Sequence, residues 1–577
     1  MTGHWPKQAI EVMRNWRLTI LACIFFILAA AIVSRLFYLQ VLHGKFYQAQ
    51  ALGQQAGFRE VTGARGQVFF QNSKESRGRY GSGELKSLAV NKEKQLLYAI
   101  PKNIKDKGLF AESLSPHIHI LKKDLLEMLA QSETYVIIKK DVPVEDVEKI
   151  QALKLTGLYW ESSLARYYPQ ENLAAQVIGF VGGENSEGQY GLEGYYEDII
   201  KGKKGIREEK NGLAVINATE PQDYLDGSDL YVTIDYNIQF QAESLLKEAK
   251  KNIDIDAGQI IVIKPDSGRV LALANYPIFD PNAYSKQKSY EVFQNSAVQK
   301  IFEPGSVFKP FIMAMALNEG KVTPESTFTD TGSVTIGPDT IYNFNREKYG
   351  AGDMSRILEK SINTGAVYLS KLLSHSTFTN YLDKLGFDEK TGIDLQGEVY
   401  SRNDLLKKGS DFGFATASFG QGIEMTPIQL VQAFSVFANQ GKMVKPYVVE
   451  KITHGQDEQI IRPEVSREII SPKTAAEVTK MMINVVDRGF GDKAKIPGYY
   501  LAGKTGTAEV PIENKKGYYT DRTVQSFIGY GPALKPEFLI LVKLDNPKVP
   551  KSSLSAAPIF KKLAQYIINY WQIAPDY

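Results

Sequence analysis

The feature that most constrains this chain is an uncharged apolar segment near its amino end, LTILACIFFILAAAIVS (residues 18–34). As a helix, these 17 residues would be roughly 25 Å long. The apolar character continues through LFYLQVL (36–42), which lengthens the segment beyond the ~30 Å hydrocarbon core of a bilayer. Only Arg35 interrupts it, and an arginine at this depth can extend its charge to the interface. We therefore predict a transmembrane helix over residues 18–42.

The charges before this segment predict its orientation. Glu11 is the only acid there, against three basic residues, Lys7, Arg14 and Arg17. By the positive-inside rule, residues 1–17 form a short cytoplasmic tail and the rest of the chain is extracytoplasmic. The expected localisation is the cytoplasmic membrane, with a single pass. A cleaved signal peptide is the alternative, because AAA (29–31) offers small residues for cleavage, but the apolar run exceeds a typical signal-peptide core.

Composition excludes several classes of function. The net charge is only +3 over 577 residues, so no strong field attracts nucleic acid. The one cysteine, Cys23, lies in the apolar segment, which excludes intramolecular disulfides and a cysteine-based zinc site. Of the six histidines, only His117 and His119 would lie together on one face of a strand, and we interpret them as part of an exposed strand. We expect no metal and no cofactor.

Two regions follow the apolar segment. Residues 43–230 have the pattern of a β-rich domain. Within it, 87–104 predicts strand, loop and strand ended by Pro101, and 121–130 and 144–153 have helical spacing.

Residues 231–577 alternate between the two kinds of periodicity. SPKTAAEVTKMMINVV (471–486) predicts a helix with Ser471 as N-cap and Pro472 at its first position. A second helix is expected over 557–571. Four apolar runs predict strands: 258–264, 269–275, 525–531 and 537–544. We therefore expect an α/β fold in which helices cover a sheet.

Three short polar motifs occur in order within this second region. They are S-V-F-K (306–309), S-I-N (361–363) and K-T-G-T (504–507). If Ser306 opens a helix after a proline-glycine turn, its Cβ lies roughly 5–6 Å from that of Lys309, on the same face. An unprotonated amine there can take the hydroxyl proton. Singly the motifs are weak, since S-I-N could be a helix cap, but the ordered triple is a strong signal.

The triple resembles the active site of penicillin-binding proteins and serine β-lactamases. Nearly the whole chain is similar to class B penicillin-binding proteins, with the catalytic transpeptidase domain at 231–577 and the non-catalytic pedestal at 43–230. The resemblance implies an α/β fold, with an antiparallel sheet flanked by helices, after a β-rich pedestal and one transmembrane helix. No glycosyltransferase region precedes the pedestal, which favours class B over class A. The segments that carry the resemblance are RLFYLQV (35–41), ARG (64–66), RYYP (166–169), GFVG (179–182), YGLEGYY (190–196), TID (233–235), DPNAY (280–284), EPGS (303–306), TGIDLQGE (391–398), SFGQGIEMTPIQL (418–430), AGKTGTAE (502–509) and AAPIFKK (556–562).

By this resemblance, Ser306 is the nucleophile that attacks a D-alanyl-D-alanine peptide and expels the last alanine. Lys309 is the candidate base. Because a free lysine has a pKa near ~10.4, burial or a neighbouring cation such as Lys504 must lower the pKa of Lys309. Lys504 and Thr505 are expected to hold the terminal carboxylate of the substrate.

The remaining positions support the same chemistry in this family. Ser361 relays a proton toward the leaving amine, and Asn363 holds the substrate amide. Gly506 has no side chain, which we expect to let the substrate backbone lie along the strand. The backbone N–H groups of Ser306 and Thr507 form an oxyanion hole, worth typically ~3 kcal/mol per donor.

Some residues depart from the family pattern or compete for a role. RGFG (488–491) stands where a glycine-threonine-glycine turn is expected, which leaves substrate preference near that loop open. QVFFQN (67–72) replaces the usual aspartate-arginine-asparagine-glycine of the pedestal. Glu303, Glu424 and Asp545 are interpreted as structural, because a carboxylate beside Lys309 would raise the pKa of that lysine.

The resemblance implies a peptidoglycan D,D-transpeptidase that acts on the stem peptides of lipid II-derived strands and is acylated by β-lactams. The expected partners are the membrane, a multi-spanning glycan polymerase and proteins of a division or elongation complex. EPGS (303–306) and the compact chain favour the septal, or division, branch over the elongation branch. The alternatives are an elongation-type enzyme, a D,D-carboxypeptidase or β-lactamase of the same fold, and a β-lactam-binding sensor or scaffold.

Overall fold

The computed structural model describes residues 7–38, 58–70, 86–142, 144–183, 186–210, 213–214, 225–512 and 517–577. The chain divides into two compact units, Met1–Ala64 with Lys201–Gly227, and Arg65–Ile200 with Ser228–Tyr577.

The first unit contains the amino-terminal helix α1 (Lys7–Phe37). Its part Ile20–Phe37 has a mean hydropathy of 2.6 and is exposed along its length, so it is long and apolar enough to cross a membrane. The helix agrees with the predicted span up to Phe37, while residues 39–42 lie outside the described residues. The same unit holds a three-stranded sheet of β1 (Phe58–Thr62), β8 (Lys204–Lys210) and β9 (Leu213–Ala214).

The β-rich part of the second unit is organised around the long strand β3 (Ser87–Ala99). It pairs with β5 (Leu158–Tyr167) from Val90 to Ala99 without a break in register. The predicted strand–loop–strand is therefore wrong, because the polar residues in its middle are an exposed stretch of one strand. The other strands of this sheet are β2 (Val68–Phe69), β4 (Val136–Val142), β10 (Asp229–Val232), β18 (Val449–His454) and β19 (Asp457–Ile460).

Three helices pack against the part of this sheet formed by β3, β4 and β5: α3 (Lys107–Ile118), α4 (Lys122–Ala130) and α5 (Val144–Gln151). The predicted helices at 121–130 and 144–153 are confirmed. The expected strand around the histidine pair is wrong, since His117 lies in α3 and His119 ends that helix in a left-handed conformation. Pro101 does end β3, by starting a short 3-10 turn.

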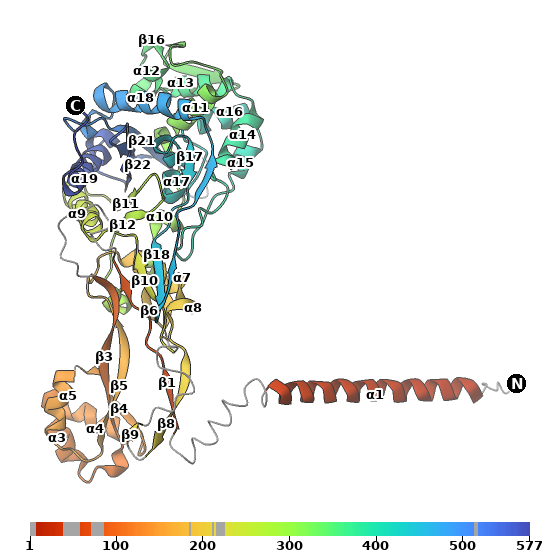
Figure 1. Cartoon of the computed structure of the whole chain (residues 1–577), viewed down its shortest axis with the longest axis vertical. Helices are drawn as coiled ribbons and strands as arrows, with labels where there is room; N and C mark the ends of the chain where they lie inside the picture. The colour runs from red at the N-terminus through yellow and green to blue at the C-terminus, as the bar shows by residue number, and fades with distance from the viewer. Residues whose placement is uncertain are drawn as a thin grey trace. The chain divides into compact units, whose positions relative to one another are not determined.

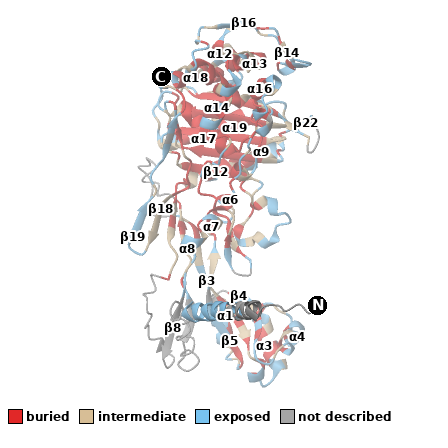
Figure 2. Ribbon diagram, turned by 90° about the vertical axis from the view of Figure 1, so that its right-hand side faces the viewer, coloured by how far each residue is buried: buried red, intermediate tan, exposed pale blue. Residues whose placement is uncertain are grey.

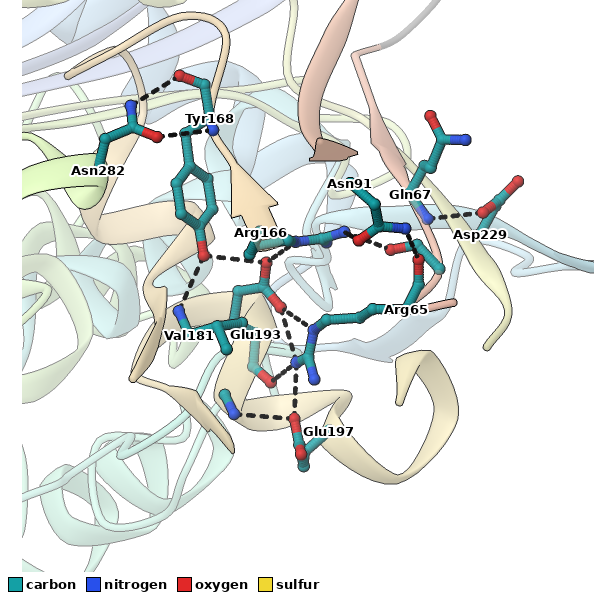
Figure 3. Close-up of polar contacts among 12 residues, drawn as sticks. Arg65, Gln67, Asn91, Arg166, Tyr168, Val181, Glu193, Glu197, Asp229 and Asn282 are labelled. Carbon is teal, nitrogen blue, oxygen red and sulfur yellow. Dashed lines mark hydrogen bonds and ion pairs between the residues drawn. The ribbon is translucent and has the colours of Figure 1, made fainter. Parts of the chain in front are cut away.

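A buried ionic network connects Arg65, at the start of the second unit, with Arg166 on β5 and Glu193 in the helix α7 (Gly191–Tyr195) (Figure 3). Glu193 is fully buried, and its two carboxylate oxygens accept hydrogen bonds from Arg65 Nε at 2.7 Å and Arg166 Nε at 2.6 Å. Tyr168 donates to the same carboxylate at 3.3 Å. Since every charge in it has a partner of opposite sign, the network can stay ionised inside the protein.

A five-stranded sheet lies in the predicted transpeptidase region and is here called the catalytic-type sheet. Its strand order is β12-β11-β23-β22-β21, and every pairing in it is antiparallel. Its strands are β11 (Ala257–Ile263), β12 (Val270–Tyr276), β21 (Ala502–Pro511), β22 (Tyr518–Gly531) and β23 (Phe538–Asp545). The four predicted strands of this region are confirmed. In Figure 2, the sheet and the helices that pack on it form the largest buried region of the protein.

Helices cover both faces of the sheet, as expected (Figure 1). Helices α9 (Tyr236–Ile253) and α19 (Ala556–Trp571) pack on one face with Ile260 and Val542. The opposite face, with Ile261 and Leu541, packs against α11 (Lys309–Asn318), α17 (Pro427–Ala438) and α18 (Pro472–Arg488). Ser471 caps α18 as predicted, because its hydroxyl accepts a hydrogen bond from Thr474 N at 3.1 Å.

Shorter elements fill the rest of the second unit. The helices are α6 (Ala175–Ile178), α7 (Gly191–Tyr195), α8 (Glu197–Ile200), α10 (Ser296–Gln299), α12 (Met354–Glu359), α13 (Asn363–Lys371), α14 (His375–Lys384), α15 (Asp404–Lys407) and α16 (Asp411–Ala417). The strands are β6 (Phe180–Gly182), β7 (Glu187–Gln189), β13 (Thr327–Asp330), β14 (Ser333–Ile336), β15 (Asp339–Tyr342), β16 (Gly350–Asp353), β17 (Lys442–Val444) and β20 (Val465–Glu468). Strands β13 to β16 lie between α11 and α12, and residues 330–350, from the end of β13 to the start of β16, are here called the excursion; β16 is labelled at the top of Figure 1.

Candidate active site

Ser306 lies on a 3-10 turn, Gly305–Phe308, and the α-helix α11 begins only at Lys309. The predicted α-helix opening at Ser306 is wrong in this detail. In a 3-10 turn the side chains of residues i and i+3 eclipse one another, so Ser306 and Lys309 still lie on one face. The backbone N–H of Lys309 donates to the carbonyl of Ser306, which closes the turn.

Two glycines hold this turn close to its neighbours. Gly305 adopts a left-handed φ of 60°, and its N–H donates to the carbonyl of Gly420 at 3.0 Å. A Cβ on Gly420 would lie 2.1 Å from the carbonyl oxygen of Gly305, so no side chain fits there. A Cβ on Gly305 would lie 3.0 Å from the carbonyl oxygen of Thr507. The turn that carries Ser306 is therefore packed directly against β21.

Lys309 is completely buried, and its side chain is directed at the second motif. Its Nζ donates to the carbonyl of Ser361 at 2.5 Å, to Ser361 Oγ at 3.2 Å and to Asn363 Oδ1 at 2.7 Å. Burial lowers the pKa of Lys309 well below its usual value, and the positive charge of Lys504 lowers it further. Both causes favour the neutral amine that a general base requires.

Ser361 reaches the lysines through an unusual backbone conformation. It lies between α12 and α13 with a φ of 53°, in the left-handed region that a serine rarely adopts. This backbone conformation costs about 1–3 kcal/mol and persists only where the surrounding structure holds the residue in place. In this conformation both the carbonyl and the hydroxyl of Ser361 accept hydrogen bonds from Lys309. The helix-cap alternative for S-I-N does not describe Ser361, since the N-cap position of α13 is Ile362.

Lys504 also contacts the hydroxyl of Ser361. It is completely buried on β21, and its Nζ donates to Ser361 Oγ at 2.9 Å. The same nitrogen donates to the carbonyl and hydroxyl of Thr505 at 3.0 and 3.3 Å. Burial lowers the pKa of Lys504 to about 7. The hydroxyl of Ser361 thus lies between two buried amines, which is an arrangement that can pass a proton from one group to another.

Gly506 is required by packing inside the protein. A Cβ at this position would lie 2.4 Å from Ser526 Oγ and 2.8 Å from Val307 Cγ1. The expected reason, free passage of a substrate backbone, is therefore not the only one: Gly506 also lets β21 approach β22 and the turn of Ser306. β21 is the terminal strand of its sheet, so an extended peptide can add to it as a further strand. Thr507 donates from Oγ1 to Ser552 Oγ at 3.4 Å.

The three acids interpreted as structural make their contacts elsewhere. Glu303 is buried and accepts hydrogen bonds from Gly422 N at 3.0 Å and Tyr518 Oη at 3.3 Å, and burial raises the pKa of Glu303 to about 7. Glu424 accepts from Ser401 Oγ at 3.1 Å. Asp545 forms an ion pair of 2.6 Å with Lys543. The cation that faces Lys309 is Lys504.

The departure RGFG (488–491) contacts the segment just before the second motif. Arg488 forms an ion pair of 3.0 Å with Glu359, the last residue of α12. Phe490 N donates to the carbonyl of the same residue at 3.0 Å. The loop after α18 thereby supports the turn that carries Ser361. The other departure, QVFFQN, begins in the loop before β2, and its residues 71–72 lie outside the described residues.

Over the described ranges, no group of three or more histidine, cysteine, aspartate or glutamate side chains is arranged to hold a metal ion. The polar groups at the candidate site are hydroxyls, amines and one amide, which suit acyl transfer by a serine nucleophile.

Comparisons with known proteins agree with this chemistry. Residues 258–565 match the penicillin binding protein transpeptidase domain, and residues 73–232 match the penicillin-binding protein dimerisation domain. Stage V sporulation protein D of Bacillus subtilis is 30% identical over 485 residues, which cover 82% of this chain and 75% of that protein. Peptidoglycan D,D-transpeptidase FtsI of Buchnera aphidicola is 29% identical over 581 residues, covering 97% of this chain and 96% of the relative.

The fold is also similar to that of solved structures. Penicillin binding protein 2X of Streptococcus thermophilus superposes with a TM-score of 0.73 over 90% of this chain and 81% of that chain. Because the sequence identity is 20%, this likeness concerns the fold alone.

Proposed function

The chain belongs to the class B penicillin-binding proteins, and from this premise we propose that it is a membrane-anchored peptidoglycan D,D-transpeptidase working through a serine acyl-enzyme. The observation that carries the proposal is that Lys309, which follows Ser306 by one 3-10 turn, and Lys504 both donate to the hydroxyl of Ser361.

The reaction follows from the roles of these groups. Ser306 Oγ attacks the carbonyl carbon of the penultimate D-alanine while its proton passes to the neutral amine of Lys309. The peptide C–N bond then breaks, and the leaving nitrogen takes a proton through Ser361. The terminal D-alanine departs, and an acyl-enzyme ester remains on Ser306. An amine of a second stem peptide attacks this ester, forms the cross-link and releases the serine.

The other site residues bind the donor peptide in this proposal. Lys504, while protonated, and Thr505 hold the terminal carboxylate of the donor. Asn363 uses one Oδ1 lone pair for Lys309 and one Nδ2 hydrogen for the carbonyl of Tyr342, which leaves one Oδ1 lone pair and one Nδ2 hydrogen for the donor backbone. The backbone N–H groups of Ser306 and Thr507 stabilise the oxyanion. A β-lactam, whose carboxylate and strained amide mimic the donor, acylates the same serine.

The experiment uses the full-length protein purified in detergent and a fluorescent penicillin. The wild type is expected to become covalently labelled, and Ser306→Ala is expected not to be labelled. Ser285→Ala, an exposed serine of the same domain, is the matched control and should be labelled normally. Labelling that persists in Ser306→Ala would place the nucleophile elsewhere.

A second measurement separates transfer from hydrolysis. A peptidyl-D-alanyl-D-alanine substrate is incubated with and without an excess of a D-amino acid as acceptor. A transpeptidase forms the exchanged peptide at the expense of the free acid, because the amine attacks the acyl-enzyme. Formation of the free acid alone, whatever the acceptor concentration, would instead identify a D,D-carboxypeptidase.

Position in the cell is part of the same proposal. The helix α1 serves as a single-pass anchor, with residues 1–17 in the cytoplasm, residues 18–42 in the membrane, the pedestal (43–230) and the transpeptidase domain (231–577) outside it. A multi-spanning glycan polymerase is the proposed partner. The name FtsI of one relative and the EPGS sequence favour a division role. A tagged copy should then collect at mid-cell, whereas an even distribution along the side wall would favour elongation.

A further inference from the structure

A buried carboxylate outside the three motifs is connected to the second motif. Asp330, at the end of β13, is 3% exposed and accepts four hydrogen bonds. The donors are Thr364 Oγ1 at 2.6 Å, Tyr349 N at 2.7 Å, Asn343 Nδ2 at 2.8 Å and Gly332 N at 2.9 Å. Burial alone would raise the pKa of Asp330, but these hydrogen bonds outweigh it and lower the pKa, so the carboxylate is ionised.

The four donors belong to two separate parts of the chain. Gly332, Asn343 and Tyr349 lie in the excursion of residues 330–350, whereas Thr364 is the second residue of α13. Asp330 therefore joins the excursion to the start of the helix that carries Asn363. Charge-assisted hydrogen bonds of this kind are roughly twice as strong as neutral ones.

The same excursion caps α13. The N-cap residue of this helix, Ile362, has no side-chain acceptor for the free N–H groups of the first turn. Asn343 supplies it instead, because its Oδ1 accepts a hydrogen bond from Thr364 N at 3.2 Å. The Nδ2 of Asn343 donates to Asp330 and to the carbonyl of Glu347 at 3.0 Å. Both the oxygen and the nitrogen of the Asn343 amide thus help to hold the excursion against the helix.

Tyr342, the residue before Asn343, orients the side-chain amide of Asn363. The carbonyl of Tyr342 accepts a hydrogen bond from Asn363 Nδ2 at 3.0 Å. With the amide nitrogen held there, the amide oxygen of Asn363 faces Lys309 Nζ at 2.7 Å. If the excursion moved, the amide would lose the contact that distinguishes its two orientations.

We propose that Asp330 is a positioning residue for acylation: with Asn343 and Thr364, it fastens the excursion of residues 330–350 to the start of α13 and so fixes Asn363 against Lys309. The inference rests on the proposed function, because its effect is expected in the acylation of Ser306. Displacing a catalytic group by about 1 Å can reduce a rate by about 100-fold. The loss expected from disrupting the Asp330 cluster is of this order.

The test measures the second-order rate constant of acylation by a fluorescent penicillin with the full-length protein. Asp330→Asn should lower it by roughly 10- to 100-fold. Thr364→Val, which removes only the hydroxyl donor, should also lower the rate constant, whereas Thr364→Ser, which keeps that donor, should retain the wild-type rate constant. Thr364→Ser and Thr364→Val keep the assay informative if Asp330→Asn does not fold.

The matched control is Asp394→Asn. Asp394 is another buried carboxylate, which accepts hydrogen bonds from Val448 N and Val449 N at 2.6 and 2.7 Å and from Tyr196 Oη at 2.9 Å. The substitution Asp394→Asn should lower the melting temperature, as Asp330→Asn does, but should not change the acylation rate of the folded protein.

The pH profile supplies a readout that a purely structural role would not move. Lys309 is faced by Ser361, Asn363 and one cation, Lys504, and burial is the main cause of its low pKa. A loosened α13 admits water, which stabilises the protonated form of Lys309 and raises its pKa. In Asp330→Asn, the rising limb of the acylation profile should therefore move to higher pH. Wild-type rates and an unchanged profile in both Asp330→Asn and Thr364→Val would overturn the inference. A wild type that no penicillin labels would instead overturn the proposed function.

Discussion

Lys504 Nζ lies 2.9 Å from the hydroxyl oxygen of Ser361, to which it donates a hydrogen bond. Lys309 Nζ lies 3.2 Å from the same oxygen. Two ammonium groups this close inside a protein repel each other strongly, because the surroundings screen charge poorly. Burial lowers the pKa of both lysines, and the positive charge of Lys504 lowers the pKa of Lys309 further, so Lys309 is the lysine that gives up its proton more readily. In the proposed mechanism, Lys309 therefore loses its proton before it acts as the base, and Lys504 remains the cation.

The first prediction concerns the base. Lys309→Ala should lower the acylation rate by about 10²–10⁴-fold, the usual contribution of a general base. The measurement is the time course of labelling with a fluorescent penicillin. Lys300→Ala, an exposed lysine shortly before the motif, is the matched control and should leave the rate unchanged. Near-normal acylation of a folded Lys309→Ala protein would exclude this lysine as the base.

The second prediction concerns pH. Burial lowers the pKa of Lys504 to about 7, so Lys504 is protonated below pH 7 and neutral above it. Since the protonated Lys504 is proposed to hold the carboxylate of a penicillin, the second-order acylation rate should fall as pH rises through about 7. Lys504→Arg keeps its charge at all these pH values, so the alkaline fall should disappear from its profile. An identical fall in both proteins would assign it to another group.

The third prediction concerns the close approach of β21. Gly506→Ala places a Cβ 2.4 Å from Ser526 Oγ and 2.8 Å from Val307 Cγ1, which forces the strand and the turn of Ser306 apart. We expect roughly 100-fold slower acylation and a lower melting temperature. The control is Gly108→Ala, whose nearest neighbour is the side chain of Asp106 at 3.2 Å. An active Gly506→Ala protein would mean that the strand adapts without moving the site.

The fourth prediction concerns stability. Glu193→Gln removes the carboxylate between Arg65 and Arg166 (Figure 3), which deprives Arg166 of this counterion and leaves Arg65 with Glu197 alone. Breaking a buried ion pair typically costs about 3–5 kcal/mol, so the melting temperature should fall clearly in a thermal unfolding experiment. Glu112→Gln breaks an exposed pair with Lys122 and should not change it measurably. Equal effects of the two substitutions would contradict a special role of the buried network.

Local signals in the sequence were sufficient for several elements. The apolar run near the amino end predicts α1, because an uninterrupted apolar helix is recognisable from composition alone. Ser471 and Pro472 predict the start of α18, because a cap is made by adjacent residues. Where pairing with a distant strand outweighs such local signals, the prediction was wrong. The polar run inside β3 resembles a turn, yet continuous pairing with β5 keeps it extended.

The sequence by itself determined the apolar helix near the amino end, the strands β11, β12, β22 and β23 and the helices α18 and α19 of the catalytic-type sheet, and the three motifs with their order. Only the tertiary structure decided that Lys309, Ser361 and Lys504 meet, that Ser361 takes a left-handed backbone, and that Asp330 fastens the excursion to α13. The physical reason is that caps and periodicity act between neighbours in the chain, whereas these contacts join segments that only packing brings within hydrogen-bonding distance.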